Sequence, residues 1–219
     1  MGKKLIIGGV IILVILGSAF YFLVLQKDKF LLYSIYGDWS KREDYVIEAR
    51  VENNQVVRNT KFGFSFLIPK QWEISERNID GRYVFILESP DRIFDTGEKI
   101  MERGCEFGIE AFESEVGFVQ NAKADIYRLQ SDPKISESEG KHLMIVGGYT
   151  AVYEKNVVPL AGQESNKSKW LDQVSIPLTD ERLLNITPLF SDTNKERCLK
   201  DFEAFLAKVQ IEGTQELSK

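Results

Sequence analysis

Hydrophobic residues are arranged along this chain in two ways, one continuous and one periodic. Residues 5–25 form an apolar run without a charged side chain, about the length that a helix needs to cross a hydrocarbon core of roughly 30 Å. From residue 46 onward, short segments alternate apolar and polar positions, as strands with one buried face do. The pattern predicts a transmembrane helix over 5–25, a short cytoplasmic N-terminus over 1–4, and a folded domain beyond the membrane.

Strand patterns dominate the domain, which we predict over residues 46–211. Phe62, Phe64, Phe66 and Ile68 alternate with other residues and share one face of a strand that Pro69 ends. Residues 91–103 are polar and predict a loop or a short helix. The other predicted strands span 45–60 around a turn at 53–54, 82–89, 105–113, 142–155 with a bulge or corner at Gly147-Gly148, and 169–190 as a hairpin across 179–181.

Two segments carry helical spacing instead. The first is predicted over about 115–129, with Ser114 as its cap, and the second over 193–209. Their apolar stripes consist of Val119, Ala122, Ile126 and Leu129, and of Cys198, Phe202, Phe205 and Val209. Hairpin-connected strands with two helices predict an α+β domain, a largely antiparallel sheet covered by helices. Residues 26–45 mix aromatic and charged residues and predict a stalk, and 212–219 predict a polar tail.

The apolar run has a second interpretation, a cleaved signal peptide. Lys3 and Lys4 form a basic start, and residues 17–19 (GSA) resemble a cleavage site. The run continues as FYFLVL beyond that site, which favours an uncleaved anchor, and the absence of Cys near it excludes a lipoprotein anchor. The excess of basic residues before the span predicts a cytoplasmic N-terminus and an extracytoplasmic domain.

Composition limits the partners of this domain. The chain has 219 residues, 43% of them hydrophobic, which is enough for one folded core. Its formal charge is −5, and because the first 29 residues contribute +3, the remainder carries −8. An acidic domain is poorly suited to nucleic acids and to anionic lipid surfaces. We therefore expect a protein or another cell-envelope component as partner, and no nucleic acid.

Residues that could perform chemistry are few. His142 is the single histidine, and no Gly-x-Ser-x-Gly motif supplies a nucleophile for it. Zinc, calcium and phosphate motifs are also missing from the sequence, so we expect no cofactor and no metal. Glu106 and Glu110 fall on the polar face of the predicted 105–113 strand, where we expect them to be solvated. A hydrolase with paired carboxylates stays open, because such pairs meet only in the fold.

Two cysteines complete the set of candidate residues. Cys105 lies on the apolar face of its predicted strand, and Cys198 lies on the apolar stripe of the last helix. Outside the cytoplasm the two could form a disulfide bond between sheet and helix, worth about 4 kcal/mol in the chain-entropy model. The alternative is a pair of separate buried thiols.

One segment carries a family resemblance. The run Thr60-Lys61-Phe62-Gly63-Phe64-Ser65-Phe66 leads into Pro69-Lys70-Gln71-Trp72, and this aromatic strand with a Pro-x-x-Trp turn resembles the opening of the PsbP-like fold. The resemblance extends over roughly 46–210 and implies an α/β/α sandwich whose members bind partners and carry no catalytic set. We therefore expect a membrane-anchored, non-catalytic binding or structural module for an envelope protein or component. A carboxylate hydrolase and a small-ligand sensor are the alternatives.

Overall fold

The computed structural model describes residues 38–48, 55–79, 82–95, 100–114, 117–132, 134, 140–158 and 169–213. The predicted transmembrane helix over 5–25, the N-terminus over 1–4 and most of the predicted stalk lie outside the described residues. None of the helices in the described part of the chain is long and apolar enough to cross a membrane.

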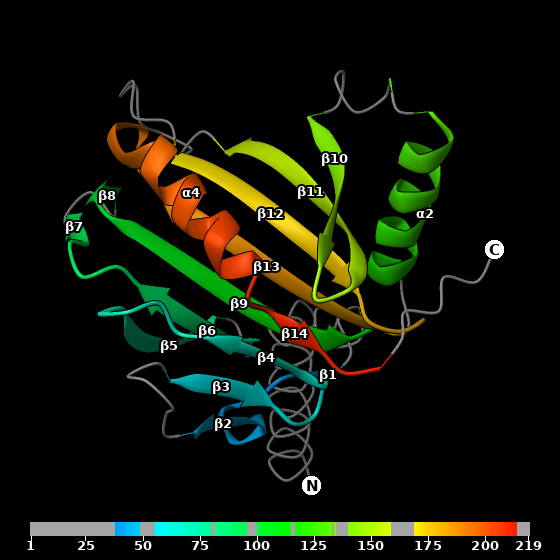
Figure 1. The fold of residues 1–219 in the computed structure, drawn as a ribbon, viewed down its shortest axis with the longest axis horizontal. Helices are drawn as coiled ribbons and strands as arrows, with labels where there is room; N and C mark the ends of the chain where they lie inside the picture. The colour runs from blue at the N-terminus through cyan, green and yellow to red at the C-terminus, as the bar shows by residue number, and fades with distance from the viewer. Residues whose placement is uncertain are drawn as a thin grey trace, which may run out of the picture.

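A large antiparallel sheet forms the centre of the domain (Figure 1). Its strands follow the order β10-β11-β12-β13-β9-β6-β5, and β1 also pairs with β9. Most neighbours along the sheet are consecutive or nearly consecutive in the chain, as hairpin-rich sheets are. The strands are β1 (Asp38–Trp39), β5 (Glu73–Ile79), β6 (Arg82–Glu88), β9 (Cys105–Glu113), β10 (Lys141–Val146), β11 (Tyr149–Val158), β12 (Lys169–Pro177) and β13 (Arg182–Phe190).

A small sheet and a separate hairpin accompany it. The small sheet has the order β14-β4-β3-β2, with β2 (Tyr45–Glu48), β3 (Val56–Asn59), β4 (Phe64–Leu67) and β14 (Gln210–Ile211). The hairpin consists of β7 (Ile93–Asp95) and β8 (Ile100–Arg103). The predicted loop or helix over 91–103 is therefore wrong: strands of three and four residues are too short for alternation to be recognised.

The two helices cover opposite faces of the large sheet. Helix α2 (Phe118–Ser131) packs with Phe112, Leu183 and Val152, whereas α4 (Lys195–Leu206) packs on the face that Phe107 occupies. Both predicted apolar stripes are buried as expected. Two short 3-10 helices, η1 (Arg42–Asp44) and η2 (Asp192–Asn194), lie before β2 and α4. Together these elements confirm the α+β class.

The start of α2 differs from the prediction. Gly117, not Ser114, precedes its first turn and has a positive φ of +67°. Ser114 is fully buried, and its backbone N–H donates to the carbonyl of Glu181 at 2.7 Å. Ser114, which the local sequence predicts as the cap of α2, is therefore bound to the β12–β13 turn instead.

Aromatic side chains build the core on the α4 face. Phe66 makes edge contacts with Phe85 and Phe205, with ring centroids 5.5 Å apart in both pairs. Phe107 contacts Trp72 at 4.6 Å. The predicted core role of the aromatic strand and of Trp72 is confirmed, because Phe66 joins the small sheet to the large one and Trp72 packs against the same core.

Both predicted limits of the domain need correction. Asp38 and Trp39 pair with Glu113 and Phe112 of β9, and Tyr45 is 3% exposed and stacks on Phe85. At the other end, the Glu212 N–H donates to the Gly63 carbonyl at 2.8 Å. Residues 38–45 and 212 therefore belong to the fold, not to a stalk or tail. Sequence periodicity missed them because their partners lie far along the chain.

A two-residue turn joins β10 to β11. Gly147 and Gly148 have φ of +57° and +86°, so the predicted corner within one strand is a tight hairpin turn between two strands. A Cβ atom at Gly147 would lie 2.9 Å from Ile211 Cγ1 and 3.1 Å from the Ile211 nitrogen, whereas one at Gly148 would meet nothing within 4 Å.

These two glycines form a matched pair for substitution. Gly147→Ala is expected to lower the free energy of unfolding by about 2 kcal/mol, because backbone strain adds to the clash with β14. Gly148→Ala carries the strain alone, so a loss of about 1 kcal/mol is expected. Urea denaturation of both variants measures the difference in the free energy of unfolding. Equal losses would show that β14 moves away from the added methyl group without cost.

Candidate functional site

A cavity of about 170 Å³ opens between α4 and the β10–β11 hairpin. Cavities that hold small-molecule ligands usually measure about 300–1,000 Å³. This cavity is smaller and matches the size of one large side chain. Its lining consists of His142, Met144, Tyr153, Lys155, Leu199, Phe202, Glu203 and Leu206.

Simple periodicities bring these residues together. His142 and Met144 are two apart on β10 and therefore share its face, and His142 pairs directly with Tyr153 of β11. On α4, Leu199, Phe202 and Leu206 follow the spacing of one helix side. The cavity thus has an apolar floor from the helix and a mixed wall from the hairpin.

A buried polar pair lies at the wall of the cavity. The Tyr153 hydroxyl donates a hydrogen bond to the carboxylate of Asp172 on β12. Tyr153 is 8% exposed and Asp172 is 2% exposed. Burial, and secondly the hydrogen bond to Asp172, raise the pKa of the Tyr153 hydroxyl. Tyr153 therefore stays protonated and acts as a donor that holds Asp172, not as a base.

His142 stands at the exposed rim, on an edge strand as the sequence predicts. Its ring lies 4.5 Å from the ring of Tyr153. Partial burial, and secondly the charge of Lys155, lower the pKa of His142, so the imidazole is neutral at pH 7. Among the described residues that line the cavity, none is Ser, Thr or Cys. This arrangement is suited to binding and lacks a nucleophile that His142 could activate.

Glu106 is buried, although the sequence predicts that it is exposed to solvent. It is 5% exposed, and its Oε2 lies 3.0 Å from a guanidinium nitrogen of both Arg77 and Arg92. Alternation does place Glu106 on the face opposite the apolar core. Side chains from β5 and from the turn after β6 cover that face here, and alternation within β9 cannot reveal this cover.

Glu110 is also less solvated than predicted. It is partly buried on the same face as Glu106, and burial raises the pKa of its carboxyl group, with Arg82 acting against the shift. The cavity lies on the other face of the sheet, where Glu203 is the carboxylate in its lining. Glu106 and Glu110 therefore cannot form a catalytic pair with it. The described residues contain no cluster of His, Cys, Asp or Glu able to hold a metal ion.

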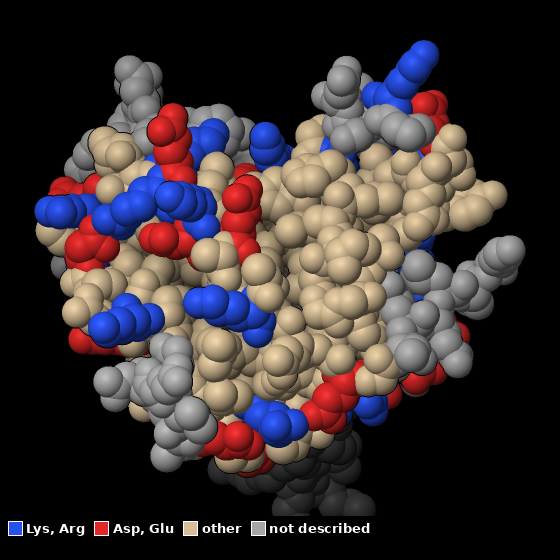
Figure 2. Space-filling view, in the orientation of Figure 1, with Lys and Arg blue, Asp and Glu red and all other residues tan. Residues whose placement is uncertain are grey.

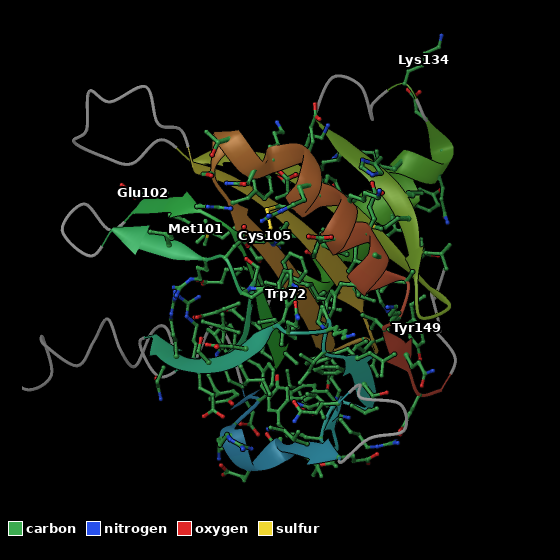
Figure 3. The ribbon with its side chains drawn as sticks, turned by 60° about the vertical axis from the view of Figure 1, so that its left-hand side comes forward. Trp72, Met101, Glu102, Cys105, Lys134 and Tyr149 are labelled. Atoms are coloured by element: carbon green, nitrogen blue, oxygen red, sulfur yellow. A yellow bond between two sulfur atoms is a disulfide. The ribbon has the colours of Figure 1, made fainter. Side chains whose placement is uncertain are left out.

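The predicted disulfide bond between Cys105 and Cys198 is present, with Cα atoms 5.7 Å apart. Figure 3 shows it at Cys105, beside α4. Both residues are fully buried, and the bond ties α4 to β9. Beside it, Arg197 donates two hydrogen bonds to Asp91, at 2.7 and 3.1 Å, and chiefly these lower the pKa of Asp91 to about 2. Helix α4, which forms the floor of the cavity, is thus held in place by a disulfide bond and by an ion pair.

Most of the cavity could not be found from the sequence. His142 alone among its lining residues stands out, and only because it is the single histidine. The apolar lining residues have the pattern of ordinary core positions of a strand and a helix, and Lys155 and Glu203 that of ordinary exposed charged residues. The space between those two elements depends on how they pack.

Comparisons with known proteins identify no family. No protein-family model matches the chain, and no curated protein matches it. Among solved structures, it is similar to LpqN of Mycobacterium tuberculosis, described as involved in cell envelope biogenesis, with 10% identity and a TM-score of 0.45 over 76% of this chain and 90% of LpqN. It is also similar to PsbP (CyanoP) of Synechocystis sp. PCC 6803, with 12% identity and a TM-score of 0.41 over 74% of this chain and 95% of that protein. The second match agrees with the resemblance drawn from the sequence. Because both TM-scores lie below 0.5, no function or residue role is transferred.

Proposed function

We propose that this chain is a membrane-anchored, non-catalytic binding module that takes one large apolar side chain of a protein partner into the cavity between α4 and the β10–β11 hairpin. The cavity carries this proposal, because its volume of about 170 Å³ suits a single side chain and falls short of the usual ligand site. A pocket of this kind is where a binding hot spot of a protein interface inserts.

The lining and its surroundings support a protein partner. Met144 and Leu199 are partly buried and offer apolar contact area, and Lys155 and Glu203 add charged groups. An apolar centre with a polar rim is typical of protein interfaces. Figure 2 shows charged side chains gathered over α4, whereas the surface over β10 and β11 is largely uncharged. A carboxylate hydrolase loses support, since Glu106 and Glu110 lie on the opposite face of the sheet.

The disulfide bond supports the proposed location. Disulfides persist in oxidising compartments outside the cytoplasm. A bond between Cys105 and Cys198 therefore agrees with a domain on the outer side of the membrane. The apolar run over 5–25 and the basic residues before it supply the anchor and the orientation with the N-terminus inside.

Site-specific photocrosslinking of the full chain in its native membranes tests the proposal. A benzoylphenylalanine in place of the exposed Lys155 is expected to crosslink one discrete protein. Leu199→Trp fills the cavity and should lower the yield about tenfold, which corresponds to a loss of about 1.4 kcal/mol in binding. Lys200→Trp adds the same ring at an exposed position of α4 and should leave the yield unchanged. Equal yields from the two tryptophan variants, or an equal product from a probe at the exposed Lys134, would refute the binding site.

A further inference from the structure

The two edge strands of the large sheet differ in a way that points to pairing at one of them. β5, at one edge, carries the charged residues Glu73, Glu76 and Arg77. β10, at the other edge, has five consecutive uncharged residues over 142–146. Charged side chains on an edge discourage the addition of another strand, and an apolar edge without them is a ready template for it.

The side chains of β10 also remain partly open to solvent. Ile145 is 67% exposed, although it is large and apolar. Leu143 and Met144, which point to opposite faces of the sheet, are only partly buried. Lys141, at the start of the strand, already contacts Asp125 at 2.8 Å and Glu154 at 3.4 Å. The centre of the edge is therefore apolar, and Lys141 at its start is engaged within the chain.

The direction of the backbone groups follows from one hydrogen bond. The Lys155 N–H donates to the Gly140 carbonyl at 3.0 Å, so Gly140 directs its backbone toward β11. Backbone groups alternate along an antiparallel strand. Those of residues 142, 144 and 146 consequently also point to β11, whereas those of 141, 143 and 145 point out of the sheet.

We propose that β10 pairs with β10 of a second copy of this chain, antiparallel and centred on Met144. In this register Met144 lies opposite Met144 of the second copy, and Leu143 lies opposite its Ile145. The outward backbone groups of residues 143 and 145 then exchange hydrogen bonds across a two-fold axis. Such a contact is self-complementary, as a closed dimer requires.

The sequence of β10 fits a second copy better than an unrelated strand. Both Leu143–Ile145 pairs fall on the α2 face of the joined sheet and bury the exposed Ile145 twice. Each Lys141 lies opposite Gly147, so like charges do not meet. A six-residue strand pair buries less than the roughly 1,200 Å² of a stable interface. The dimer is therefore weak in dilute solution and forms between copies held in one membrane, where the effective concentration is high.

Cysteine crosslinking of the full chain in membranes tests this contact and its register. Directly opposed Cα atoms of a non-hydrogen-bonded pair lie about 4.5 Å apart, within reach of a disulfide. Mild oxidation of Met144→Cys is expected to give a covalent dimer on a non-reducing gel. The native cysteines are bonded and fully buried, so they do not contribute. Tyr127→Cys, on α2 at a residue 70% exposed, is the matched control and should stay monomeric.

A second substitution separates pairing from chance collision. Ile145→Pro, added to Met144→Cys, removes a backbone N–H that points out of the sheet and leaves the bonds to β11 intact. It is expected to lower the dimer yield about tenfold, while an intact Cys105–Cys198 bond reports a folded domain. A dimer band that persists, equal crosslinking at Tyr127→Cys, or crosslinking at Leu143→Cys in place of Met144→Cys would overturn the proposal. Because Met144 also lines the partner cavity, Leu199→Trp is added to Met144→Cys as a further control. An unchanged dimer yield is expected, since the filled cavity leaves the outward backbone groups of residues 143 and 145 in place.

Discussion

Removal of the Cys105–Cys198 bond by the double variant C105A/C198A is expected to lower the free energy of unfolding by about 4 kcal/mol. The bond joins residues separated by 93 positions, and a cross-link over such a long loop restricts the unfolded chain strongly. Both side chains are fully buried, so alanine also leaves two small gaps between β9 and α4. Urea denaturation of the full chain at neutral pH, monitored by tryptophan fluorescence, measures the loss.

Chemical reduction provides the matched control for this result. A reductant should destabilise the parent protein by a similar amount and leave C105A/C198A unchanged. Thiol counting should find no free thiol in native protein from the membrane. A loss below 1 kcal/mol, or two free thiols in native protein, would contradict the structural role of the bond. Two free thiols would also remove the support that the disulfide gives to the proposed extracytoplasmic location.

The substitution Glu106→Ala is expected to cost about 3 kcal/mol of stability. Glu106 is 5% exposed and accepts contacts at 3.0 Å from both Arg77 and Arg92. Its removal leaves the Arg92 guanidinium, whose side chain is 19% exposed, without this buried countercharge. Breaking a buried ion pair from one side typically costs 3–5 kcal/mol. The partial exposure of Arg77 and the remaining carboxylate of Glu88, 3.0 Å from Arg92, place this case at the lower end.

Glu113→Ala is the matched control on the same strand. Glu113 contacts Arg182 at 3.5 Å, and its side chain is 34% exposed. Solvent screens such a pair, so a loss below about 1 kcal/mol is expected. Denaturation of both variants under identical conditions makes the comparison. If the two losses are equal, Glu106 is solvated as the sequence predicts, and its packing against Arg77 and Arg92 does not hold in solution.

Strong local patterns in the sequence correspond to the structure closely. The stripe of Val119, Ala122, Ile126 and Leu129 lies buried under α2, and the alternating Phe64 and Phe66 lie in the core. The patterns of their elements place Cys105 and Cys198 on apolar faces, and the two are bonded. In these cases one face of an element is buried along its whole length, so the side-chain period alone specifies the inward residues.

The sequence by itself thus determined the α+β class, the two helical stripes, the inward-facing positions of Cys105 and Cys198 and the expectation of an anchor over 5–25, which lies outside the described residues; the structure decided between a disulfide bond and two separate thiols. Tertiary structure decided the rest. Glu106 is buried by residues of β5 and of the turn after β6, residues 38 and 39 pair with β9, and the cavity depends on how α4 sits against β10 and β11. The physical reason is common to all three. The side-chain period of a helix or strand determines which way a side chain points. Burial and binding depend on which other part of the chain packs against that side chain.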